Sequence, residues 1–141
     1  MKKTVAVLAA GIGFLVGSLP VLAHHSFAAE YDQSKPVTLK GTFVKMDWTN
    51  PHSWVYFTVT ENGKTEEWRA ETPPPNALVR NGWRPNMLKG GEEMTVRGYL
   101  AKDGTNLMFA QNVTLADGRV IGLGSAPEPV NKGGEKGGGQ Q

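Results

Sequence analysis

An alternation of apolar and polar residues recurs between Val37 and Ile121, and it limits the possible folds more than any other feature of the chain. A period of two residues is typical of strands that bury one face. Dipeptides that favour tight turns interrupt the alternation at Asn62-Gly63, Asp103-Gly104 and Asp117-Gly118. The sequence therefore predicts a domain made mainly of β-strands.

Five strands and one short helix are expected from this pattern. The first strand, 37–48, changes parity after Phe43, which predicts a β-bulge, and Gly41 eases the bend. Trp83 and Leu88 are expected to close one end of the core. The other elements are a strand over 54–59, a strand around Trp68 and Ala70, a helical turn over 76–81 after three prolines, strands over 94–100 and 107–115, and a reversal into Val120 and Ile121.

The element order β-β-β-α-β-β is that of a small five-stranded OB-like β-barrel, an all-β fold with one short helix. The bent first strand fits this fold, because one long curved strand serves both halves of the sheet in such barrels. An open β-sandwich with a similar number of strands is the competing interpretation. We assign the barrel to residues 37–122 and an N-terminal arm to residues 24–36.

The first 23 residues have the three parts of a secretory signal peptide: Lys2-Lys3, an apolar stretch over 5–19, and Ala23 at the expected cleavage site. An uncleaved membrane anchor is the alternative, but the apolar stretch is short for a bilayer span of about 20 residues. We therefore expect a periplasmic or secreted protein with no stable membrane anchor after cleavage. Cleavage after Ala28 instead would remove both N-terminal histidines.

Charge and composition narrow the possible partners of the mature chain. Lys2 and Lys3 leave with the signal peptide, so the 15 basic residues fall to 13 and equal the 13 acidic ones. Without a basic cluster, a nucleic-acid partner is not expected. The chain has no cysteine, so its core or a ligand must hold it together. Residues 123–141 form a glycine-rich tail that is expected to be disordered, leaving about 90 residues for one domain.

The three histidines, His24, His25 and His52, carry the sharpest chemical signal. An N-terminal histidine can chelate one metal ion through its α-amine and its ring Nδ1, and a further imidazole completes a nitrogen-only set that suits Cu(II). Zinc is the alternative ion. The arm, which spans about 40 Å when extended, can fold back along the first strand and bring His24 beside His52. His52 in a hydrogen-bonded turn or stacked on Trp54 is the competing interpretation.

Other residues near His52 have weaker interpretations. Asp47 and Asn50 flank the loop of His52 and are expected to orient its imidazole. Trp48 and Trp54 offer an aromatic surface for a glycan, a peptide or a periplasmic protein. Three glutamates are expected to form a solvated strand edge, and three methionines are expected to fill the core. These are Glu66, Glu67 and Glu71, and Met46, Met94 and Met108.

Several strings of residues resemble a family of small exported bacterial proteins of unknown function. They are Ala23-His24-His25-Ser26-Phe27, Lys35-Pro36-Val37-Thr38-Leu39-Lys40-Gly41, Trp48-Thr49-Asn50-Pro51-His52-Ser53-Trp54, Asn76-Ala77-Leu78, Gly82-Trp83 and Leu88-Lys89-Gly90-Gly91-Glu92. The resemblance extends to about Ile121, with Met108-Phe109 as a mild departure. It implies export, a small β-fold and joint use of the two histidine motifs, and it implies no reaction.

Three functions follow from these residues. The first is a periplasmic metal-binding protein, for copper, that carries or buffers the ion through His24, His52 and also His25. The second is a barrel that binds an oligosaccharide, a peptide or a protein across its aromatic face without a metal. The third is a small copper-dependent enzyme that cleaves polysaccharides oxidatively, which about 90 folded residues leave little room for. A binding protein is therefore expected rather than an enzyme.

Overall fold

In the computed structural model of this protein, a strongly curved first strand organises the fold. The structure describes residues 27–124. Their elements are α1 (Phe27–Glu30), β1 (Tyr31–Asp47), β2 (Ser53–Glu61), β3 (Lys64–Thr72), α2 (Pro75–Arg80), β4 (Glu93–Ala101), β5 (Leu107–Leu115) and β6 (Val120–Gly122). The expected signal peptide, His24 and His25, and the tail from residue 125 onward lie outside the described residues.

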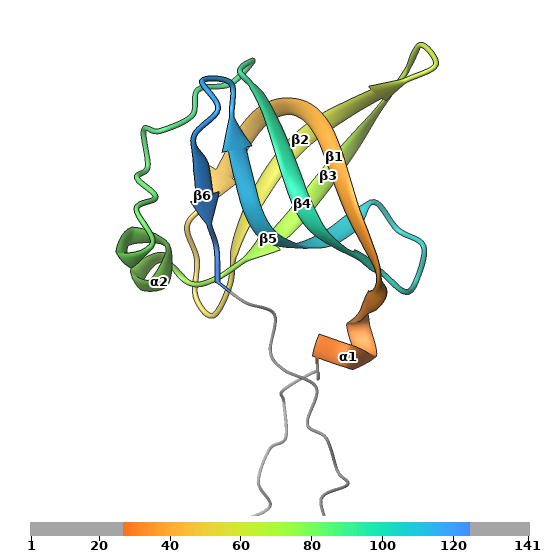
Figure 1. Ribbon diagram of the computed structural model, residues 1–141, viewed down its shortest axis with the longest axis horizontal. Coiled ribbons are helices and arrows are strands. Elements are labelled where there is room, and N and C mark those ends of the chain that lie inside the picture. Colours follow the sequence, from red (N-terminus) through yellow and green to blue (C-terminus); the bar gives the residue numbers. More distant parts are fainter. Residues whose placement is uncertain (1–26, 125–141) are drawn as a thin grey trace, which may run out of the picture.

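Strands β1 to β5 close into a barrel (Figure 1). Strand β1 pairs with β2 along its second half and with β4 along its first, so it serves both halves of the sheet. A short parallel pairing of residues 69–71 in β3 with 107–109 in β5 closes the ring. Helix α2 lies between β3 and β4, which confirms the predicted OB-like barrel. Closure of the barrel excludes the open sandwich. Strand β6 adds a short strand beside β5.

The predicted bulge in β1 is present, because the register to β2 shifts between Phe43 and Lys45. Gly41 is required at the bend, where a Cβ atom would lie 2.5 Å from the Thr58 carbonyl oxygen. The strand starts at Tyr31 rather than at Val37, so part of the expected arm belongs to the sheet. The alternation does not reveal this part, because its register to β4 is irregular between Tyr31 and Pro36.

The main core fills the barrel between the strands and α2. Trp83 and Leu88 are buried in it, as predicted, together with Leu78 of α2. Met94 and Met108 are also core residues, and Met46 packs against them from a partly buried position. Leu123 is fully buried and its N–H donates to the Gln111 carbonyl at 2.8 Å, so the folded domain extends past residue 122.

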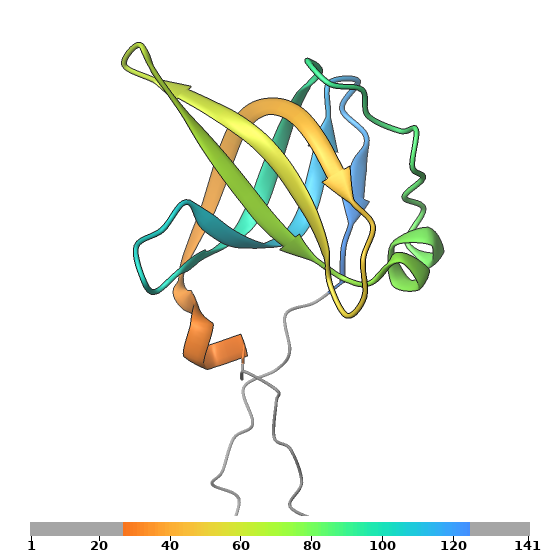
Figure 2. The same ribbon diagram turned by 180° about the vertical axis from the view of Figure 1, so that it is seen from behind.

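A second, smaller apolar cluster joins α1 to the outer side of the barrel. Its buried members are Tyr31, Ala101, Leu107 and Phe109, and Phe27, Trp54 and Tyr99 pack against them. Seen from behind, α1 lies below the barrel beside the loop that connects β4 to β5 (Figure 2). This cluster therefore fixes where the chain enters the barrel. Within residues 27–124, no helix has the length and apolar character needed to cross a membrane.

Candidate functional site

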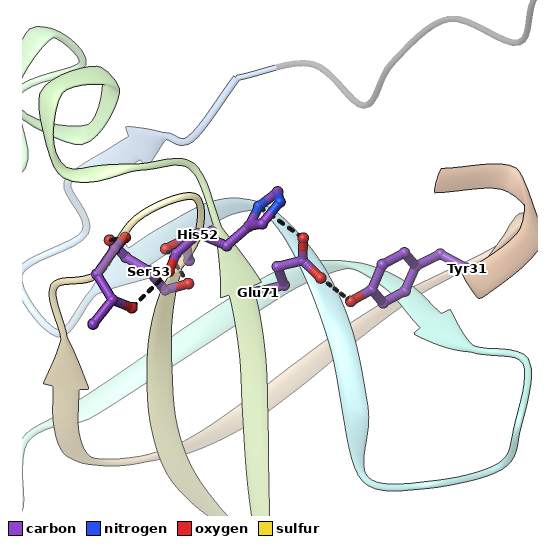
Figure 3. Close-up of polar contacts among 6 residues, drawn as sticks. Tyr31, His52, Ser53 and Glu71 are labelled. Atoms are coloured by element: carbon purple, nitrogen blue, oxygen red, sulfur yellow. Dashed lines mark hydrogen bonds and ion pairs between the residues drawn. The ribbon is translucent and has the colours of Figure 1, made fainter. Parts of the chain in front are cut away.

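Three polar side chains from distant parts of the chain, Tyr31, Glu71 and His52, form one row of polar contacts, which we call the polar row (Figure 3). His52 Nδ1 lies 2.9 Å from Glu71 Oε1. The Tyr31 hydroxyl donates a hydrogen bond to the other carboxylate oxygen, Oε2. Tyr31 begins β1, His52 lies in the β1–β2 loop, and Glu71 lies near the end of β3. Closure of the barrel is what brings these three segments together.

Hydrogen bonds around the β1–β2 loop fix the backbone of His52. Thr49 Oγ1 donates to the His52 carbonyl at 2.7 Å, and the fully buried Ser53 hydroxyl donates to the Thr49 carbonyl at 3.3 Å. Thr72 Oγ1, also buried, donates to the Ser53 carbonyl at 3.0 Å. The loop is thereby tied to the end of β3, one residue from Glu71. The backbone of His52 is held, while its side chain remains 48% exposed.

Glu71 does not belong to a solvated strand edge, as the sequence led us to expect. Glu67 is exposed and Glu66 half-buried, but Glu71 is only 8% exposed. The end of β3 pairs with β2 on one side and with β5 on the other, and Glu71 lies opposite Trp54 and Phe109 in these ladders. A carboxylate in this position requires donors, and Tyr31 and His52 supply them.

Tyr31 stays a proton donor in this row. Burial, followed by the hydrogen bond to Glu71 and by the negative charge of that carboxylate, raises the pKa of the phenol far above its usual value. The protonated phenol therefore occupies Oε2, while the Oε1 atom lies 2.9 Å from His52 Nδ1 and favours a proton on that nitrogen. A neutral imidazole that donates from Nδ1 carries its lone pair on Nε2. Nε2 is thus the atom through which His52 can bind a ligand or a metal ion.

The other expected site residues lie elsewhere. Asp47, expected to orient the imidazole, instead pairs with Lys45 at 3.0 Å, so the carboxylate beside His52 is Glu71. Asn50 is exposed in the same loop as His52. Trp48 packs against the main core. Trp54 packs against the second cluster, with the Arg69 guanidinium 5.1 Å from its ring centre.

His24 and His25 lie outside the described residues, so the structure does not place them relative to His52. Within residues 27–124, no three His, Asp or Glu side chains gather closely enough to hold a metal ion. Of the expected histidine ligands, His52 is the one that lies in this range. A nitrogen-only site that includes it needs further ligands from outside residues 27–124.

These features define a small OB-like β-barrel domain that presents one imidazole, oriented by a buried carboxylate, at the loop between its first two strands. The chain belongs to a family of unknown function, DUF6152, whose family model matches residues 13–109. The matched range contains all three histidines together with Tyr31 and Glu71. Membership confirms the resemblance noted in the sequence. No curated protein matches the chain.

Proposed function

We propose that the mature protein binds a copper ion in the periplasm and carries or buffers it there. The ligands are the α-amine and ring of His24, Nε2 of His52, and His25 as an additional imidazole. The observation that carries the proposal is the contact of 2.9 Å between His52 Nδ1 and Glu71 Oε1. A carboxylate beside Nδ1 favours a proton there, which leaves the lone pair on Nε2 of a side chain that is 48% exposed.

A carboxylate that accepts the second ring N–H is the usual partner of a metal-binding histidine. The carboxylate fixes the tautomer and the ring orientation, and it raises the basicity of the metal-binding nitrogen. Glu71 is in turn held by Tyr31, so the carboxylate keeps its place beside the imidazole. A loop histidine without a binding role would not need a carboxylate beside its ring.

Copper is favoured over zinc because of the donor set. An amine and two or three imidazoles form a nitrogen-only set, which suits the tetragonal geometry of Cu(II). Structural zinc sites are closed and tetrahedral, with four protein ligands that usually include thiolates. The chain has no cysteine to supply one. Zinc remains the ion to compare in the experiment.

The first test determines the N-terminus of the exported protein by intact mass. A chain that begins at His24 supports the proposal, whereas cleavage after Ala28 contradicts it. Cu(II) affinity is then measured by competition titration for the mature chain, for His52→Ala, and for a chain whose His24 α-amine is blocked by acetylation. We expect each change to weaken binding by at least tenfold, because each removes one nitrogen of the chelate.

Electron paramagnetic resonance on the same samples counts the bound nitrogens. The mature chain should show coupling to more nitrogens than either altered chain. Trp48→Phe is the matched control, because Trp48 lies close to His52 in the sequence and packs against the core rather than the imidazole. Equal affinity in the mature chain and in the chain with the blocked α-amine would rule out the chelate.

A second candidate function has its own observation. The outer face of β1, β2 and β3 carries two aromatic rings with cations beside them: Lys45 Nζ lies 4.4 Å from the Tyr56 ring centre, and Arg69 lies over Trp54. Such a face binds glycans or peptides in OB-like barrels. If Trp54→Ala abolished binding of a glycan array ligand while His52→Ala had no effect, this function would replace copper binding.

A further inference from the structure

Phe27, the first residue that the structure describes, is packed into an aromatic cluster. Its ring centre lies 5.2 Å from that of Tyr31, 6.0 Å from Tyr99 and 4.7 Å from Phe109. The contacts with Tyr99 and Phe109 are edge-to-face, the arrangement that aromatic quadrupoles favour. We call Phe27, Tyr31, Tyr99 and Phe109 the aromatic anchor. It fixes the chain three residues after His24.

Lys102, in the loop between β4 and β5, holds the same segment by polar contacts. Its ammonium group donates to the Ala28 carbonyl at 2.6 Å. Its backbone N–H donates to the Glu30 carbonyl at 2.9 Å. The four-residue helix α1 is therefore bound to the barrel through both its side chains and its backbone, although three of its four residues are exposed.

Tyr31 belongs to both the aromatic anchor and the polar row. Its ring packs against Phe27 and Phe109, at centroid distances of 5.2 Å and 5.7 Å, while its hydroxyl donates to Glu71. Glu71 in turn orients His52. Figure 3 shows Tyr31 extending from the base of α1 toward Glu71 and the imidazole. Tyr31 therefore contacts both the segment that leads to the N-terminus and the carboxylate beside the His52 imidazole.

We propose that Phe27 is a positioning residue, which holds the mature N-terminus within reach of His52 Nε2. The inference rests on the proposed copper function and adds the device that makes its chelate effective. Three extended residues span at most about 10 Å, so chain length alone limits how far the His24 amine can lie from an anchored Phe27. Confinement of this kind raises affinity by roughly 10²–10⁴ over unlinked ligands.

A cluster that merely closed the barrel would affect stability and not the chelate, and this difference makes the proposal testable. The experiment measures Cu(II) affinity of the full mature chain and of Phe27→Ala. It repeats the pair in a background with His24→Ala and His25→Ala, where His52 is the only histidine that remains. We expect Phe27→Ala to weaken binding at least tenfold in the first background and to leave the second unchanged.

Lys102→Ala is the second variant, because Lys102 is exposed and its loss removes the contact with Ala28 without disturbing the core. It should weaken copper binding less than Phe27→Ala, in the mature background alone. Lys89→Ala is the matched control, because this exposed lysine belongs to the segment that connects α2 to β4. Figure 1 shows that segment on the other side of the barrel from α1. Thermal melting of every variant verifies that the fold persists.

The outcomes separate the two proposals. Tight copper binding by the mature chain that neither Phe27→Ala nor Lys102→Ala weakens would overturn the positioning role and leave the copper function standing. Equal losses in both backgrounds would also overturn it, since Phe27 would then act through His52 or through the fold. If the mature chain itself binds no copper tightly, both proposals fail together.

Discussion

Replacing Glu71 by glutamine exchanges one side-chain oxygen of the polar row for an NH2 group. The side chain at position 71 then becomes a donor, rather than an acceptor, toward His52. Tyr31 is buried and its phenol keeps its proton, so the glutamine must turn its carbonyl oxygen toward the hydroxyl. Its amide then points at His52 and donates to Nδ1. A neutral imidazole that accepts at Nδ1 carries its proton on Nε2. The substitution therefore removes the lone pair from Nε2, the nitrogen proposed to bind copper, while the side-chain shape is kept.

The magnitudes separate this effect from a loss of fold. Removing the carboxylate that orients a metal-binding histidine costs about 10–100-fold in metal affinity, or about 1.4–2.7 kcal/mol. The free energy of unfolding should fall less, by about 1 kcal/mol, because a neutral hydrogen bond replaces a charge-assisted one and no donor is left unpaired. Copper affinity is thus expected to change more than stability.

Two measurements test this prediction. Nitrogen chemical shifts of the imidazole, recorded without metal in mildly alkaline buffer, report the tautomer directly. We expect the Nδ1–H form in the wild type and the Nε2–H form in Glu71→Gln. Cu(II) titration of both chains then gives the loss of affinity, and urea unfolding gives the loss of stability.

Glu67→Gln is the matched control, since Glu67 lies on the same strand but is exposed. It should leave the tautomer, the copper affinity and the stability unchanged. An unaltered tautomer in Glu71→Gln would refute the reasoning, because the carboxylate would then not determine which ring nitrogen binds the proton. Unaltered copper affinity with a reversed tautomer would show that Nε2 of His52 is not a ligand.

Three further predictions concern the fold. The first concerns Tyr31, whose phenol loses its proton near pH 10.0 in the unfolded chain and keeps it in the folded chain. The contribution of Tyr31 to stability should therefore be constant below that pH and fall above it by up to about 1.4 kcal/mol per pH unit. Tyr31→Phe should flatten this decline in alkaline urea unfolding. Gly98→Ala would place a Cβ atom 1.7 Å from the Phe109 carbonyl oxygen. The free energy of unfolding should fall by at least about 3 kcal/mol, because backbone atoms cannot move aside. A folded variant of wild-type stability would contradict the observed β4–β5 pairing. Leu78→Ala empties a fully buried position of α2 and should cost about 2–5 kcal/mol, whereas Val79→Ala, at an exposed position, should cost less than about 0.5 kcal/mol.

The sequence predicted the elements of the fold wherever local chemistry determines them. Alternation located the strands, and Asn62-Gly63 and Asp103-Gly104 located two turns, because a residue in a tight turn needs the positive φ that both glycines adopt. The parity change after Phe43 predicted the bulge. From these elements the β-β-β-α-β-β order led to the barrel, since few topologies accommodate it.

The candidate site could be predicted only in part, because its partners are distant in sequence. Tyr31 lies 40 residues from Glu71, and nothing local distinguishes Glu71 from Glu66 and Glu67. Burial of Glu71 depends on the parallel pairing of β3 with β5 and on the early start of β1, neither of which leaves a pattern in the sequence. Asp47 was a reasonable expectation on proximity alone, but a lysine two residues away engages it.

The buried carboxylate is itself an argument for function. A domain with no cysteine depends on its core for stability, and replacing a buried polar network by packed apolar residues is often neutral or stabilising. Glu71 nevertheless occupies the second apolar cluster, between Trp54 and Phe109, where it needs both Tyr31 and His52 as donors. Tyr31 satisfies one oxygen, and the second oxygen is the one that lies beside the imidazole. A leucine at position 71 would serve the core about as well as Glu71 does. What Glu71 adds is a fixed imidazole ring and an available Nε2 on His52.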